Sequence, residues 1–206
     1  MDIEQLIFDV AGALRYPVLI LALASLALVL VEAGAFAVEL VRRRRRDTAR
    51  LERVAETART ALQDGDVPGA RRALMQIAWS GAMAATLDLI AERVRGGGGG
   101  PDRVAKALAD FDFASLRRLE RTRVLVRAGP ALGLMGTLIP LAPALAGLAD
   151  GDVAQLSRNL RVAFSVTVLG LVVGAVAFAI SLVRDRIYGQ DLSDLEFVAA
   201  TLEAPS

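Results

Sequence analysis

Cysteine and histidine are both absent from the 206 residues of this sequence. Without cysteine there is no disulfide, thiolate-bound metal cluster or cysteine nucleophile, and without histidine there is no histidine-based triad. The apolar stretches described below also lack a pair of acids that would bind a metal or activate a nucleophile. We therefore expect no enzyme, and we predict no catalytic residue, metal ligand, cofactor or small-molecule substrate.

Long apolar runs dominate what is present, since 54% of the residues are hydrophobic and the mean hydropathy is +0.47. A membrane-spanning helix needs roughly 20 mostly apolar residues. Three stretches meet this requirement, at residues 17–41, 128–149 and 162–183. The second and third contain no charge, whereas the first contains Glu32 after a run of uncharged residues and Glu39 near its end. The sequence thus predicts an all-α membrane protein with three transmembrane helices.

Arginine is distributed very unevenly, and this distribution predicts the orientation. Residues 42–127 contain 19 of the 24 basic side chains and 11 of the 23 acidic ones, for a net charge of +8. Basic segments next to spans stay in the cytoplasm. We therefore expect the N-terminus and a loop at 150–161 outside, and residues 42–127 and a tail at 184–206 inside. The protein is then a multi-pass protein of a bacterial or archaeal inner (plasma) membrane.

The segments outside the spans are also expected to be helical. Residues 1–16 have the apolar spacing of an amphipathic helix lying on the outer interface. Within 42–127, apolar spacing predicts a helix over 51–62 that continues the first membrane helix, then helices over 70–94 and 102–127. The glycine run at 96–100 is expected to be a flexible linker, because no Gly-Lys-Ser/Thr phosphate loop follows it.

The second and third spans each have a face of small residues, which lets helix backbones approach closely. Such a face implies a tightly packed partner helix, from this chain or from another. The predicted packing or partner face comprises Gly129, Gly133, Gly136 and Pro140 on the second span and Gly170, Gly174 and Ser181 on the third.

Three polar side chains within the spans are candidates for an ion pathway. Thr137 and Thr167 either bond a carbonyl of their own helix, the usual arrangement of a membrane threonine, or line a hydrated ion path. Glu32 is an intramembrane acid near the cytoplasmic end of the first span. It either contributes to the path or begins an interfacial ladder of ion pairs in which Arg43 pairs with Glu39.

A run of five arginines, Arg42, Arg43, Arg44, Arg45 and Arg46, follows the first span. We interpret it as a topology determinant that also contacts lipid headgroups. Aromatic residues do not alternate with these arginines, so a nucleic-acid site is not expected.

Two motifs resemble a known family. The run from Gly129 to Thr137, GPALGLMGT, is similar to the Pro-x-Leu-Gly-Leu-x-Gly-Thr signature of the MotA/TolQ/ExbB proton channel family. The run from Ala163 to Leu171, AFSVTVLGL, resembles that family's Ala-Leu-x-x-Thr-x-x-Gly-Leu segment. The predicted topology is that of the ExbB and TolQ branch.

The resemblance implies a stator-like subunit that uses an ion gradient to do mechanical work on another system. Five copies would form a homo-oligomer around a pair of single-span partners of the ExbD/TolR/MotB type. The partner would supply the aspartate that carries the ion, and Thr137 and Thr167 would line the path beside it. Lipid is the other expected partner.

The chain departs from the family pattern in the third span. Arg161 or Val162 stands where relatives carry a glutamate, and Val166 replaces one of a pair of threonines. Conduction would then rely on hydroxyls, water and the partner's carboxylate, and the ion is either proton or sodium. The alternative is an oligomeric membrane scaffold that does not conduct.

Overall fold

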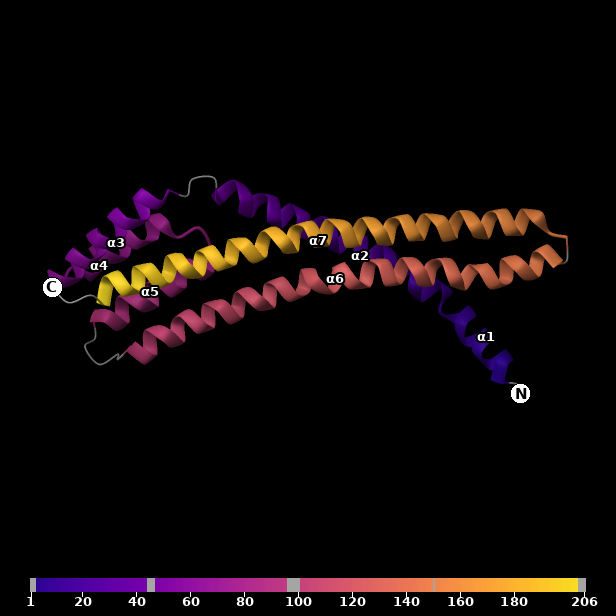
Figure 1. The fold of residues 1–206 in the computed structure, drawn as a ribbon, viewed down its shortest axis with the longest axis horizontal. Helices are drawn as coiled ribbons and strands as arrows, with labels where there is room; N and C mark the ends of the chain where they lie inside the picture. The colour runs from indigo at the N-terminus through magenta and orange to yellow at the C-terminus, as the bar shows by residue number, and fades with distance from the viewer. Residues whose placement is uncertain (1–2, 44–46, 96–100, 150, 204–206) are drawn as a thin grey trace. The chain divides into compact units, whose positions relative to one another are not determined.

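A computed structural model describes residues 3–43, 47–95, 101–149 and 151–203 (Figure 1). These residues form α-helices and one short 3-10 helix, and contain no strand. The helices are α1 (Ile3–Ala13), α2 (Arg15–Arg43), α3 (Thr48–Gln63), α4 (Val67–Leu74), η1 (Met75–Ile77), α5 (Gly81–Arg95), α6 (Pro101–Ala149) and α7 (Val153–Glu203). The predicted all-α fold class is confirmed.

Three helical stretches are long and apolar enough to cross a membrane: Gln5–Arg43, Asp102–Ala149 and Val153–Glu203. Many large apolar side chains on these helices are exposed, for example Leu30, Leu134 and Leu171. Exposed apolar surface of this extent is typical of contact with lipid or with another protein. The number of candidate spans therefore agrees with the prediction from hydropathy.

The chain divides into two compact units. The first unit comprises residues 1–35 and 120–182, and the second comprises residues 36–119 and 183–206. Helices α2, α6 and α7 each contribute one part to each unit.

In the first unit α6 and α7 are antiparallel neighbours joined by a tight turn. Gly151 has a φ of +82°, a left-handed conformation that glycine adopts without strain. Asp152 then caps α7, because its side chain accepts a hydrogen bond of 2.8 Å from the Gln155 N–H. The segment predicted as a loop at 150–161 is thus already helical from Val153 onward.

In the second unit the core lies among α3, α4, α5 and the adjoining parts of α6 and α7. Its largest fully buried side chains are Leu74, Ile77, Met83, Leu87, Ile90 and Leu195. Polar caps begin its short helices: Asp47 accepts from the Ala49 N–H at 3.0 Å, and Asp66 accepts from the Gly69 N–H at 2.9 Å. Each cap satisfies a helical N–H that would otherwise lack a partner.

Two predictions about the helices of this unit are wrong. Residues 51–62 belong to a separate helix, because Asp47 has extended backbone angles and starts α3. The helix predicted over 70–94 is interrupted by η1 and the residues that follow it. The interruption has a local cause, since Ala78 is extended and the Ser80 hydroxyl accepts a bond from the Met83 N–H near the start of α5. The predicted linker at 96–100 lies outside the described residues.

Candidate functional site

Glycines bring α6 and α7 into backbone contact in the first unit. A Cβ atom placed on Gly129 would lie 2.6 Å from the Gly170 carbonyl oxygen and 2.8 Å from the Gly174 nitrogen. A Cβ on Gly170 would clash with the Gly129 carbonyl oxygen and would lie 2.8 Å from the Gly133 Cα. Real Cβ atoms do not approach other atoms this closely, so each position requires glycine.

The same contact extends along both helices. A Cβ on Gly174 would lie 2.8 Å from the Pro130 ring, and one on Gly136 would overlap the side chain of Val166. The glycines predicted as a packing or partner face therefore meet each other's helices within this chain. Ser181 is buried and donates to the Phe178 carbonyl of its own helix at 2.9 Å.

The two candidate pathway threonines are on neighbouring helices, and Thr167 lies at this interface. Thr167 Oγ1 is 3.2 Å from both the Ala163 carbonyl of α7 and the Gly133 carbonyl of α6. Gly133 is one helical turn before Thr137, whose hydroxyl donates to the Leu134 carbonyl at 2.7 Å. Thr167 thus links the two helices, whereas the hydroxyl of Thr137 bonds its own helix.

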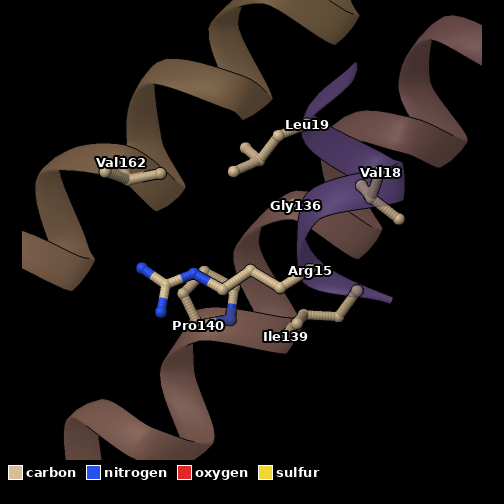
Figure 2. A pocket seen from close by; sticks show the side chains of 7 residues that line it. All are labelled: Arg15, Val18, Leu19, Gly136, Ile139, Pro140 and Val162. Atoms are coloured by element: carbon tan, nitrogen blue, oxygen red, sulfur yellow. The ribbon is translucent and has the colours of Figure 1, made fainter. Parts of the chain in front are cut away.

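Arg15 of α2 lies near Gly136 and Pro140 of α6 in the first unit (Figure 2). The Arg15 side chain extends from α2 past Pro140 of α6 towards α7, where it donates to Asn159 Oδ1 at 3.3 Å. Arg15, Gly136, Pro140 and Val162 line a cavity of about 10 Å³, near the smallest volume that holds one water molecule. The guanidinium group of Arg15 thus places a positive charge next to the apolar side chains that line this cavity.

The second unit contains two ion pairs between α2 and α7. Arg184 Nε lies 3.3 Å from Glu39 Oε2, and the Arg184 guanidinium also lies 5.9 Å from the Phe36 ring centre. Arg43 pairs with Asp191 and donates to the Ile187 carbonyl at 3.0 Å. Burial raises the pKa of the Asp191 carboxyl, and the neighbouring Arg43 partly offsets this effect.

These pairs correct the predicted ladder, because Arg43 does not pair with Glu39. Both side chains are on one face of α2, but α7 presents opposite charges closer to each of them. Ion pairs between α2 and α7 therefore form in place of the expected Glu39–Arg43 pair within α2. Glu32 is half-buried on α2. Arg42 is exposed at the end of α2, and Arg44, Arg45 and Arg46 lie outside the described residues.

Sequence reasoning did not select Arg15, Asn159, Arg184 or Asp191 as site residues. The signals that were present are a lone arginine just before the first apolar run, and charges within one to eight residues after the third. No spacing rule links these residues to their partners, because the partners are more than 140 positions apart in the chain.

The helices, their glycine contact and their exposed apolar surface are those of a helical membrane protein. Residues 103–195 match the sequence model of the MotA/TolQ/ExbB proton channel family, which confirms the predicted family resemblance. The matched stretch is a little under half of the chain and includes the predicted second and third spans. The curated proteins compared with the chain include none that matches it.

Proposed function

We propose that this chain is an ion-conducting subunit, for protons or sodium, of a stator-like complex in the inner membrane. The match to a proton channel family over α6 and α7 supports a channel-type membrane protein. The observation that carries the proposal is the position of Thr167, whose hydroxyl lies between two carbonyl oxygens at the contact of these helices. Oxygen atoms that line a pore can replace the hydration shell of a cation that passes through an apolar protein.

The working unit in this proposal is an oligomer. Five copies surround a pair of single-span partner helices, and the partner's aspartate carries the ion past Thr137 and Thr167. Residues 42–127 lie in the cytoplasm and the N-terminus lies outside, as the arginine distribution predicts. Because the glycines of α6 and α7 are already packed against each other, the partner would contact the edge of this interface, where Thr137 and Thr167 are only half-buried.

The assembly is tested by co-expressing the chain with the adjacent reading frames and weighing the detergent-extracted complex by native mass spectrometry. We expect five copies of this chain with two copies of a single-span protein that bears an aspartate. A monomer or dimer that recruits no such protein contradicts the proposal.

Conduction is tested by ion flux into proteoliposomes containing the complete complex. Replacing Thr167 with valine removes the hydroxyl at nearly constant volume, and we expect it to reduce flux at least about tenfold. Thr167→Ser retains the hydroxyl and is expected to conduct. The matched control is Thr201→Val, because Thr201 donates in the same way to a carbonyl of its own helix, at 2.8 Å, near the end of α7.

One observation favours an alternative, a scaffold that does not conduct. The hydroxyls of both threonines already have carbonyl acceptors in the chain, which is what a purely structural role requires. The scaffold predicts equal flux at background level in all three variants and in the unmodified complex. Unchanged flux in Thr167→Val, in a complex that does conduct, would show that the ion path lies elsewhere.

A further inference from the structure

A wide groove in the second unit lies where α2 ends and α3 and η1 meet. It consists of two adjoining cavities of about 510 and 500 Å³, both of which are lined by Arg50 and Gln76. Arg42 and Trp79 line the first cavity, and Arg53 lines the second. We call this feature the Arg50 groove. It is separate from the α6–α7 contact of the first unit.

The groove is strongly basic. Among the described residues, three arginine side chains line it and no carboxylate does. Within the described part of the chain, Arg42 and Arg50 form no ion pair or side-chain hydrogen bond, and Arg53 donates only to the Ala49 carbonyl, at 3.1 Å. Elsewhere in this unit arginines do have acidic partners, as in the pairs of Arg43 and Arg71. The positive charge of the groove is therefore not neutralised by these residues.

Trp79 adds a second, independent feature. Its indole N–H is buried but has no hydrogen-bond acceptor among the described residues. A buried donor without an acceptor costs free energy, and an indole N–H donates but does not accept. Trp79 lines the first cavity, so a ligand bound there would contact its ring. The three guanidinium groups favour a ligand rich in negatively charged oxygen atoms.

We propose that the Arg50 groove binds a phosphate group. Guanidinium groups match the geometry of phosphate oxygens and form paired, charge-assisted hydrogen bonds with them. Arg42 lies in the last turn of α2, directly after the predicted first span, so the groove is at the level of the cytoplasmic headgroups in the proposed orientation. The phosphate comes either from an anionic lipid headgroup or from a soluble phosphorylated molecule.

Trp79 is the only tryptophan of the chain, so its fluorescence reports directly on the groove. The full chain is placed in nanodiscs of phosphatidylcholine, either alone or with increasing phosphatidylglycerol, and the emission of Trp79 is recorded. Inorganic phosphate is titrated into the phosphatidylcholine nanodiscs in a second series. Retention of phosphatidylglycerol in native mass spectra and isothermal titration with phosphate measure binding independently of the fluorescence.

We expect a saturable change in one of the two series, with binding confirmed by the direct measurement. Arg50→Gln should weaken this binding at least about tenfold, because it removes a charge-assisted hydrogen-bond donor shared by both cavities. The matched control is Arg103→Gln, which makes the same charge change at an exposed residue of α6 that does not line the groove.

The two series identify the source of the phosphate. A response to phosphatidylglycerol alone indicates a lipid site, and a response to inorganic phosphate in phosphatidylcholine indicates a soluble ligand. Absence of binding in both direct measurements would overturn the proposal. Equal losses in Arg50→Gln and Arg103→Gln would also overturn it, because they would show attraction to the net charge of the unit.

Discussion

The close contact of α6 and α7 predicts a specific effect of enlarging Gly170. In Gly170→Ala the new Cβ would lie 2.8 Å from the Gly133 Cα and 2.9 Å from the Gly133 nitrogen. Both neighbours are backbone atoms, so a change of side-chain rotamer does not relieve the overlap. Because carbon atoms in contact prefer about 3.5–4.0 Å, the two helices must separate by roughly 1 Å.

This separation determines the size of the effect. Overpacking of a tight interface typically costs about 1–3 kcal/mol. The hydrogen bond from Thr167 to the Gly133 carbonyl is 3.2 Å long and would be stretched beyond a useful length. Its loss adds about 0.6 kcal/mol, the average for such bonds between membrane helices. We therefore expect Gly170→Ala to lower the free energy of unfolding by about 2 kcal/mol.

The measurement is an SDS titration of the purified full chain in detergent, followed by far-ultraviolet circular dichroism. Gly34→Ala is the matched control, because Gly34 lies in α2 and a Cβ there would meet no atom within 4 Å. This control should be neutral, or more stable by up to about 1 kcal/mol, since alanine favours a helix over glycine. Equal stability of the two variants would refute the packing of α6 against α7.

The ion pairs of the second unit give two more predictions. Arg184→Gln should lower the free energy of unfolding by roughly 1–3 kcal/mol, and with it the thermal unfolding midpoint, because it leaves the half-buried Glu39 without this partner. Arg186→Gln, at an exposed position, should change the midpoint little. Burial raises the pKa of the Asp191 carboxyl despite the nearby Arg43, so the folded chain binds this proton more tightly than the unfolded chain. The resulting contribution to stability is fully present below the unfolded pKa and is lost as the pH rises through the higher folded pKa. The stability of the unmodified chain relative to Asp191→Asn should therefore fall as pH rises from about 4.

Both predictions have clear contrary results. If Arg184→Gln and Arg186→Gln unfold at the same midpoint, the pair with Glu39 does not contribute to the stability of the second unit. If the difference between the unmodified chain and Asp191→Asn is constant with pH, then the Asp191 carboxyl has the same pKa in the folded and unfolded chains.

Local sequence features predicted the three long apolar helices well, because hydropathy depends only on the residues along one segment. Prediction was weaker in the second unit, where the helix expected over 70–94 is interrupted. Its apolar residues have helical spacing on both sides of the break, so periodicity alone does not reveal it. The cap at Ser80 and the extended backbone of Ala78 are stabilised by packing in the core of this unit.

For the candidate site, too, the sequence predicted the local features but not the contacts between helices. The small residues of α6 and α7 were evident from their spacing, but whether they meet each other or a second chain was not. The structure shows Gly129, Gly133 and Gly170 in contact, and with them the hydrogen bond from Thr167 to the facing helix. This pairing depends on how two long helices are rotated and offset, which spacing within either helix does not specify.

The sequence by itself determined the class of protein: its apolar runs are typical of a membrane protein, its arginine asymmetry predicts an orientation, and two motifs resemble the family whose model matches residues 103–195. Only the tertiary structure decided which charges meet, as in the pair of Arg43 with Asp191 across 148 positions of the chain. The physical reason is that burial in lipid is a property of each segment alone. An ion pair instead forms with whichever opposite charge the packing of helices brings within a few ångströms.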